Sequence, residues 1–237
     1  MEQHTENINA IQTATKAAAI NNSDAVWLNQ DKINAQVGYL FIKRIFDIVA
    51  SFAALFILSP LFLVIAILIK LEDPKGPVFY SQIRVGRNGK KFRMYKFRSM
   101  CVDADKKLKD LLAKNEVEGA MFKMKDDPRI TRVGKWIRKT SVDELPQLWN
   151  VLHGDMALVG PRPPLPRETA TYSEYDKQRL YVQPGCTGLW QVSGRNDVGF
   201  HEMVALDIQY IKTRNLWVDI KIMIKTVGIM IHPNGAY

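Results

Sequence analysis

An unbroken apolar run dominates the pattern of hydrophobic and polar positions along this chain. The run extends from Ile48 to Ile69, reads IVASFAALFILSPLFLVIAILI, and contains no charged residue over 22 positions. As a single helix it would be about 33 Å long at 1.5 Å per residue, and about 20 apolar residues are enough to cross the hydrocarbon core of a bilayer. Helices in soluble cores rarely stay apolar on every face for this length. The pattern therefore predicts a membrane-attached protein rather than a buried core helix.

Ser59 and Pro60 interrupt this run near its middle. Proline lacks an N–H and clashes with the carbonyl four residues back, here that of Phe56, and the Ser59 hydroxyl can bond a carbonyl at Leu55 or Phe56. The break leaves segments of 12 and 10 residues, about 18 and 15 Å long, and neither crosses a bilayer alone. Basic residues flank both ends, whereas a spanning helix normally shows a bias to one side. A re-entrant hairpin fits both features, and a kinked spanning helix is the alternative.

The polar and apolar pattern divides the chain into three parts. Residues 1–37 are rich in Asn, Gln, Ala and Thr and predict a mobile polar arm. Residues 38–72 form the membrane hairpin, which the segment DPKGP ends. Residues 73–237 form a larger domain with interfacial helices.

Within that domain, the segments VFYSQIRVG and KFRMYKFRSM flank the turn residues Arg87, Asn88 and Gly89, which predicts a β-hairpin. Apolar periodicity predicts helices over 141–152, 202–212 and 216–231. The last of these is apolar enough either to lie in a membrane interface or to pack in the core. The predicted fold class is α+β and mainly helical.

Composition narrows the function classes. The chain has 33 basic and 24 acidic side chains and a net charge of +9, which indicates anionic partners such as phosphates, nucleic acid or a membrane surface. Two cysteines, Cys101 and Cys186, exclude a disulfide scaffold, and no CxxC pattern indicates zinc. The glycine-rich signatures of common ATP and dinucleotide sites are absent.

Asp143 and Glu144 are the candidates for chemistry, in the segment RKTSVDELPQLWNVL. Consecutive helix positions point about 100° apart, so the two carboxylates can take different roles at one site. The structural alternative is a capping box, in which Ser141 is the N-cap and Glu144 completes the motif. Arg138 and Lys139 are expected to keep both acids ionised. An ionised aspartate can act as a nucleophile, and a neighbouring carboxylate can hold Mg²⁺ together with substrate phosphates.

Three arginines have settings that suit a phosphate ligand. Arg138 lies in the basic segment TRVGKWIRK, Arg162 in the proline-rich turn GPRPPLP, and Arg195 directly after Gly194. Arginine binds phosphate oxygens bidentately, and glycine lets the backbone approach a ligand closely. Taken singly, each is more simply explained as a solvated surface charge. Together, in a membrane-attached chain, they predict an anionic ligand.

Five segments occur in an order that resembles the bacterial sugar transferase family, the monotopic phosphoglycosyl transferases of the undecaprenyl-phosphate pathway. They are KRIFDIVAS, the apolar run with its Ser-Pro break, FYSQIRVGRNGKKFRMYKFRSM, SVDELPQLWNVLHGDMALVGPRP and PGCTGLWQVSGRND. The resemblance covers about residues 41–237, nearly the whole chain beyond the arm.

The resemblance implies transfer of a sugar 1-phosphate from a UDP-sugar to undecaprenyl phosphate, with release of UMP. It matches Asp143 to a nucleophile that forms a covalent phosphosugar intermediate, and Glu144 to the carboxylate associated with Mg²⁺ and the phosphates. Both are therefore candidate metal ligands. It matches the family's substrate-binding positions to basic residues of this chain, namely Lys96, Arg98, Arg138, Arg162 and Arg195.

The resemblance also implies that the hairpin broken at Ser59 and Pro60 does not cross the bilayer. Residues 73–237 then form a cytoplasmic catalytic domain on the bacterial inner membrane. The implied partners are the UDP-sugar, undecaprenyl phosphate and membrane lipid, with a second copy of the chain and without nucleic acid. A Gly-Ala-Tyr tail like that of longer relatives, which often use hexoses, favours galactose or glucose as the sugar.

Two other functions compete with this interpretation. A non-enzymatic, membrane-anchored basic protein would use the net charge to bind nucleic acid or anionic lipid. Its basic residues, however, lie among glycines and prolines rather than on a repeated aromatic–basic platform. An inactive assembly scaffold is the other alternative, and the intact Asp-Glu pair argues against it.

Overall fold

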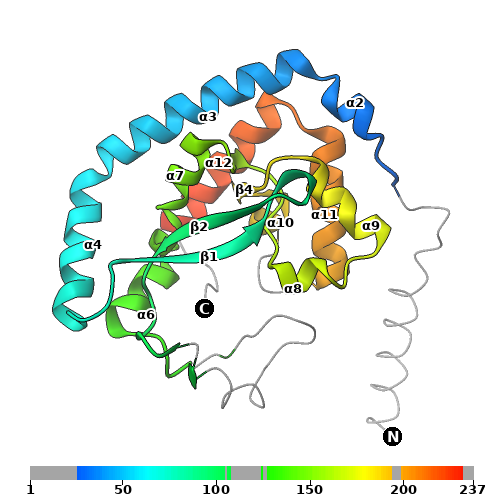
Figure 1. The fold of residues 1–237 in the computed structure, drawn as a ribbon. Helices are drawn as coiled ribbons and strands as arrows, with labels where there is room; N and C mark the ends of the chain where they lie inside the picture. The colour runs from blue at the N-terminus through cyan, green and yellow to red at the C-terminus, as the bar shows by residue number, and fades with distance from the viewer. Residues whose placement is uncertain (1–25, 105, 108–123, 125–126, 194–198, 232–237) are drawn as a thin grey trace, which may run out of the picture.

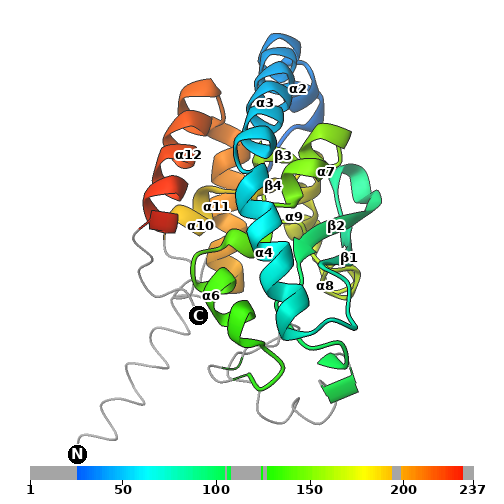
Figure 2. The same cartoon turned by 90° about the vertical axis from the view of Figure 1, so that its left-hand side faces the viewer.

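A computed structural model of the protein describes residues 26–104, 106–107, 124, 127–193 and 199–231, and every structural statement below concerns these residues. The described fold is mainly helical, with one antiparallel hairpin and one short parallel strand pair. In Figure 1 two consecutive helices form a bent arm along one side, and the other elements lie on its concave side; Figure 2 looks onto this arm. The elements are α2 (Gln30–Asn34), α3 (Val37–Ile57), α4 (Ser59–Glu72), β1 (Phe79–Val85), β2 (Lys91–Phe97), α6 (Arg132–Lys139), α7 (Gln147–His153), β3 (Ala157–Val159), α8 (Pro166–Thr169), α9 (Glu174–Lys177), β4 (Gly185–Thr187), α10 (Leu189–Ser193), α11 (Phe200–Thr213) and α12 (Leu216–Ile231).

The bent arm consists of α3 and α4, which meet at an angle of 58°. The break lies at the predicted position, because Pro60 has no N–H to offer the Phe56 carbonyl. The Ser59 hydroxyl donates to that carbonyl instead, at 2.7 Å. Among the described helices none is both long and apolar enough to cross a membrane alone, and α3 and α4 meet that requirement only as a bent pair.

In the bent arm, α3 has its polar face inward and its apolar face outward, whereas α4 is apolar on both sides and buries Ile65 and Ile69. Lys43, Asp47 and Ser51 on α3 are buried against the rest of the protein. A helix of a soluble protein shows the opposite arrangement. The outward face of α3 and α4 carries large exposed apolar side chains, namely Val37, Phe41, Ile42, Ile45, Phe46, Ile48, Val49, Phe52, Phe56, Ile57, Leu63, Val64, Ile67, Leu68 and Leu71.

A buried polar network joins α3 to the C-terminal helix α12. Lys43 Nζ lies 2.9 Å from Asp219 Oδ2, and the Tyr39 hydroxyl donates to the same oxygen at 2.9 Å. The Tyr210 hydroxyl from α11 donates to Asp219 Oδ1 at 2.7 Å. Asp219 is 3% exposed, so its charge is stabilised by these partners rather than by water.

The predicted β-hairpin is confirmed. β1 and β2 pair antiparallel, with Phe79 opposite Phe97 and Val85 opposite Lys91. The turn residues Asn88 and Gly89 have φ values of 55° and 78°. Asparagine and glycine tolerate this left-handed conformation better than other residues, which explains why the turn forms here.

Three small apolar clusters replace a single large core. The first lies where α2, β3, α11 and α12 meet, the second joins α4, β2 and α6, and the third joins the hairpin to α7. Their buried members are Ile33, Val159, Val182, Tyr210, Ile211 and Ile222 in the first; Ile65, Ile69, Phe97 and Ile137 in the second; and Phe92, Met94, Val151 and Met156 in the third.

The ends of the described chain differ in part from the predictions. The last part of the N-terminal segment 1–37, which was expected to be mobile, is packed against the fold. Ile33 in α2 is buried in the first cluster, and the Leu28 N–H donates to Gln178 Oε1 at 2.6 Å. Residues 1–25 lie outside the described residues.

The helices predicted over 202–212 and 216–231 are confirmed as α11 and α12. α12 packs against the core through Ile222, while Trp217 on the same helix is 69% exposed, so the interfacial position of this helix stays a prediction.

We expect Asp219→Asn to destabilise the protein strongly, because it leaves the buried Lys43 charge without its closest partner. Removing one partner of a buried ion pair costs about 3–5 kcal/mol of unfolding free energy, and we expect the lower end because Asp47 stays near Lys43. Urea unfolding in detergent, followed by tryptophan fluorescence, measures the change. Lys221→Ala removes an exposed charge from the same helix and is the control; equal effects of the two variants would contradict the prediction.

Candidate active site

The carboxylate pair lies in a short 3-10 turn, so the helix predicted over 141–152 is wrong in its first part and confirmed only from residue 147 onward. The turn covers Val142–Glu144, and α7 begins only after Pro146. Pro146 causes the break, because it cannot donate a hydrogen bond to the turn before it. Ser141 has a φ of 57° and makes no side-chain capping bond, so the capping box is also absent. A left-handed non-glycine residue beside two carboxylates is the kind of backbone strain that occurs at functional sites.

Asn150 fixes α7 against β2. Its side-chain NH₂ donates to the Arg93 carbonyl at 2.6 Å, and its side-chain oxygen accepts from the Tyr95 N–H at 3.1 Å. Asn150 is 1% exposed, so water does not compete for these bonds. The next residue on β2, Lys96, pairs with Glu144 Oε1 at 2.5 Å. The predicted substrate-binding lysine therefore lies at the carboxylate pair.

Asp143 is the more deeply buried carboxylate of the pair, with 8% of its surface exposed. Burial raises its pKa to about 6, and the negative charge of Glu144 adds to this rise. The positive charges of Lys96 and Arg138 act in the opposite direction but do not compensate. The nearby basic residues therefore favour ionisation of Asp143, as expected, but burial outweighs their effect on its pKa.

Glu144 behaves differently from its neighbour. Burial opposes its ionisation, but the charge and hydrogen bond of Lys96 outweigh burial and lower its pKa. Arg162 and Arg84 act in the same direction. Adjacent carboxylates whose pKa values move in opposite directions are suited to different chemical roles.

The charge of Arg162 acts on Glu144, and a pair of parallel strands positions this arginine. β3 and β4 run side by side, so the segments that follow them, carrying Arg162 and Trp190, leave the same edge. The Arg162 guanidinium lies 5.9 Å from the centre of the Trp190 ring, within cation–π range. The two backbone segments come so close here that a Cβ on Gly185 would lie 2.1 Å from the Gly160 nitrogen. Glycine is therefore required where the strands bring Arg162 and Trp190 together.

Arg84 and Trp190 also belong to the site but are not predicted from the sequence. Arg84 is 5% exposed and donates to the Pro163 carbonyl at 3.0 Å. Burial lowers the pKa of Arg84 to about 10, and the charge of Arg162 acts in the same direction. An arginine in a hairpin strand and a single tryptophan carry no distinguishing pattern, so no signal in the sequence identifies them.

The other predicted basic residues have separate positions. Arg138 is half-buried at the end of α6, close enough for its charge to act on Asp143. Arg98 pairs instead with Asp73, with Nη1 to Oδ2 at 2.5 Å, and so holds the chain that leaves α4. Arg195 lies outside the described residues.

Comparisons with known proteins agree with the motif order. The sequence matches the bacterial sugar transferase family over residues 38–233. It is 50% identical over 201 residues to a galactosyl transferase of Streptococcus agalactiae, CpsE, covering 84% of this chain and 44% of that protein. It is 50% identical to an undecaprenyl-phosphate galactose phosphotransferase of Salmonella typhimurium, covering 83% of this chain and 42% of that protein.

A shorter relative is covered over most of its length. The exopolysaccharide production protein ExoY of Rhizobium meliloti is 43% identical over 199 residues, which are 82% of this chain and 88% of that protein. The chain spans less than half the length of the first two relatives. The similarity therefore concerns the part that contains the bent helix pair and the carboxylates.

The raised pKa of Asp143 predicts that its ionisation costs stability. The folded protein keeps this proton up to about pH 6, whereas the unfolded chain loses it near the ordinary value of 3.8, so stability falls as pH rises through this window. We expect Asp143→Asn to raise the unfolding free energy at pH 7.5 by up to about 3 kcal/mol, at about 1.36 kcal/mol per pKa unit, and to have little effect at pH 4.

Denaturant unfolding of the variant and the natural protein at both pH values tests this expectation. The same substitution at Asp155, which follows α7, controls for the change from aspartate to asparagine itself. A gain that is equal at pH 4 and pH 7.5 would show that the Asp143 charge is not its cause.

Proposed function

The chain belongs to the bacterial sugar transferase family, and from this premise we propose that it transfers a sugar 1-phosphate from a UDP-sugar to undecaprenyl phosphate. The released product is UMP. The observation that supports this reaction most is the buried Asp143 beside the Lys96–Glu144 pair, with Arg84, Arg138 and Arg162 acting on the two carboxylates. Such a site suits a diphosphate, whose charge needs several fixed cations.

In the proposed first step, an Asp143 carboxylate oxygen attacks the phosphorus that carries the sugar. The bond between that phosphorus and the bridging oxygen of the diphosphate breaks, and UMP leaves with the electron pair. With a pKa of about 6, Asp143 is mostly ionised above neutral pH. Because the buried carboxylate is poorly hydrated, it loses little hydration when it attacks the phosphorus. Lys96 and the arginines stabilise the charge that develops on the phosphate oxygens.

In the proposed second step, an oxygen of the lipid phosphate attacks the same phosphorus. The bond to Asp143 breaks, which regenerates the free carboxylate and leaves the sugar on a lipid diphosphate. The two half-reactions use one site in turn, so they predict ping-pong kinetics.

Mg²⁺ is the cofactor that we propose for this site. The described residues contain no group of three or more His, Cys, Asp or Glu side chains arranged for a metal. Mg²⁺ nevertheless needs only one or two carboxylates when substrate phosphates and water complete its ligands, and Asp143 and Glu144 fit that donor set. A bound cation would also relieve the cost of burying the Asp143 charge. When bound, it would neutralise charge on the diphosphate.

The bent arm supports a monotopic, re-entrant attachment to the inner membrane. Its outward apolar face would lie in lipid, while the 58° bend at Ser59 and Pro60 would return the chain to the side from which it entered. Residues 73–237 would then face the cytoplasm, where UDP-sugars occur. The implied second copy of the chain stays a prediction.

A hexose is the proposed sugar. Two of the relatives described above are named for galactose, which makes galactose the first choice and glucose the second. Galactose and glucose differ from each other only in the orientation of one hydroxyl group. Contacts to the sugar outside the carboxylate pair must therefore distinguish them.

UMP release from a panel of UDP-sugars, with and without undecaprenyl phosphate, tests the proposed reaction. We expect release with one hexose donor and loss of about 10³-fold or more of the rate in Asp143→Asn, because the variant has no nucleophile. Intact-mass measurement should detect a phosphosugar adduct on the natural protein but not on the variant. Asp155→Asn is the matched control. If Asp143→Asn released UMP as fast as the natural protein, Asp143 could not be the nucleophile.

We expect chelation by EDTA to stop UMP release and added Mg²⁺ to restore it, because the two carboxylates need a cation to bind a diphosphate closely. The assay compares the rates before chelation, after chelation and after Mg²⁺ is added back. Full activity in excess EDTA would remove Mg²⁺ from the proposed site.

A further inference from the structure

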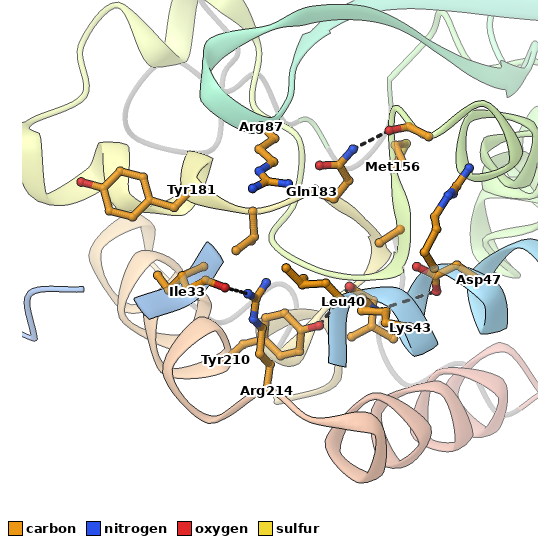
Figure 3. A pocket seen from close by; sticks show the side chains of 15 residues that line it. Ile33, Leu40, Lys43, Asp47, Arg87, Met156, Tyr181, Gln183, Tyr210 and Arg214 are labelled. Atoms are coloured by element: carbon orange, nitrogen blue, oxygen red, sulfur yellow. Dashed lines mark hydrogen bonds and ion pairs between the residues drawn. The ribbon is translucent and has the colours of Figure 1, made fainter. Parts of the chain in front are cut away.

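A cavity of about 220 Å³ lies apart from the carboxylate pair. Neither Asp143 nor Glu144 nor Lys96 lines it. Figure 3 shows that its side chains come from the inner face of α3, from the turn between β1 and β2 above it, and from the segment between α11 and α12 below it. The proposed transfer reaction gives this cavity no role.

Three guanidinium groups line this cavity, those of Arg44, Arg87 and Arg214. In the part of the chain that the structure describes, none of the three forms an ion pair with a carboxylate. The ammonium group of Lys43 also lines the cavity, but Asp219 and Asp47 balance its charge. Asp47 also lines the cavity, and its charge acts on Arg44 as well, so the two carboxylates offset only part of the four positive charges and a net positive charge remains.

The hydrogen-bond partners of these arginines are neutral. Arg87 Nη2 donates to Asn34 Oδ1 at 2.7 Å, and Arg214 donates to Gln36 Oε1 at 3.1 and 3.2 Å. Such partners satisfy individual N–H groups but supply no counter-charge in direct contact with the guanidinium groups. An unpaired charge in a partly enclosed site is costly unless a counter-ion enters.

Arg87 and Arg214 approach the cavity from opposite sides, as Figure 3 shows. Burial lowers the pKa of Arg214; the negative charge of Asp219 opposes this shift, whereas the positive charge of Arg87 adds to it, so the two guanidinium groups repel each other. Arg87 Nε is buried and has no hydrogen-bond partner among the described residues. An anion between the two guanidinium groups would relieve the repulsion and accept the free N–H.

We propose that this cavity binds a phosphate-type anion and is a second ligand site, separate from the carboxylate pair. Phosphate is favoured over a simple halide because guanidinium groups bind its oxygens in pairs. Apolar side chains of Leu40, Val182 and Tyr210 line the rest of the cavity and suit the organic part of a phosphate ester. A free phosphate ester and a phospholipid headgroup share this chemistry.

The bound anion would connect three elements that are distant in the sequence. Arg87 belongs to the hairpin turn, Arg214 follows α11, and Arg44 belongs to α3. Its binding should therefore slow local opening of the hairpin turn and of the segment after α11.

Hydrogen exchange measured by mass spectrometry tests the proposal, because it locates the protected segments. One arm adds inorganic phosphate to the intact protein in zwitterionic detergent, and the other compares nanodiscs of phosphatidylglycerol with nanodiscs of phosphatidylcholine. We expect protection of residues 85–92 and 211–217 in at least one arm. The soluble arm alone would identify a free phosphate as the source, and the nanodisc arm alone a lipid headgroup.

Arg87→Gln is the decisive variant. We expect it to raise the half-saturating phosphate or phosphatidylglycerol content by about tenfold, the loss expected when one charge-assisted hydrogen bond is removed. Lys91→Gln removes the same charge from an exposed position on the same hairpin and should leave binding unchanged. Asn34→Ala removes the neutral partner of Arg87 and should also retain protection, which separates anion binding from packing of α2.

Three results would overturn the proposal. The first is the absence of saturable protection in both arms. The second is an equal loss in Arg87→Gln and Lys91→Gln, which would indicate unspecific attraction. The third is protection confined to residues 141–149, which would place the anion at the carboxylate pair.

Discussion

The ion pair between Lys43 and Asp219 is the interaction on which the rest of the structure depends. It holds α3 against α12 at 2.9 Å, and both residues are largely buried. The residue after Lys43, Arg44, donates to the carbonyls of Val151 and Leu152 at 2.6 and 2.9 Å, at the end of α7. A cation at this end satisfies free carbonyls and complements the helix dipole. Because α7 begins directly after the carboxylate pair, the position of α3 determines the position of the site.

Local signals in the sequence predicted the elements that depend on neighbouring residues. The break at Pro60 and the hairpin turn at Gly89 follow from the conformations that proline and glycine allow, and both are confirmed. The turn at Val142–Glu144 was predicted wrongly as the start of a helix. The capping-box pattern favours a helix from Ser141, but Pro146 interrupts the hydrogen bonds that such a helix needs. The β3–β4 pair has three residues in each strand and joins segments far apart, so no local pattern indicates it.

The same distinction applies to the candidate site. Its charged residues could be proposed from their motifs, but their partners could not. Lys96 is bonded to Glu144, whereas Arg98, two residues later, is bonded to Asp73, because successive partners depend on how β2 lies between α7 and the end of α4. The opposite pKa shifts of Asp143 and Glu144 likewise arise from burial and from one lysine contact. The spacing of the two acids in the sequence indicates neither how deeply they are buried nor which of them contacts the lysine.

The arm also explains how one site can serve a lipid and a soluble nucleotide under the proposed function. Its two helices are bonded directly to the helices that frame the carboxylates: Arg44 of α3 to α7, and Glu72 of α4 to the Arg132 and Val133 N–H groups that begin α6, at 2.7 and 3.0 Å. The carboxylates therefore lie one helix layer behind the outward apolar face. A polyprenyl phosphate would bring its phosphate across this layer while its tail stays in hydrocarbon. The nucleotide would approach from the edge where β3 and β4 present Arg162, so the two substrates need not compete for one entrance.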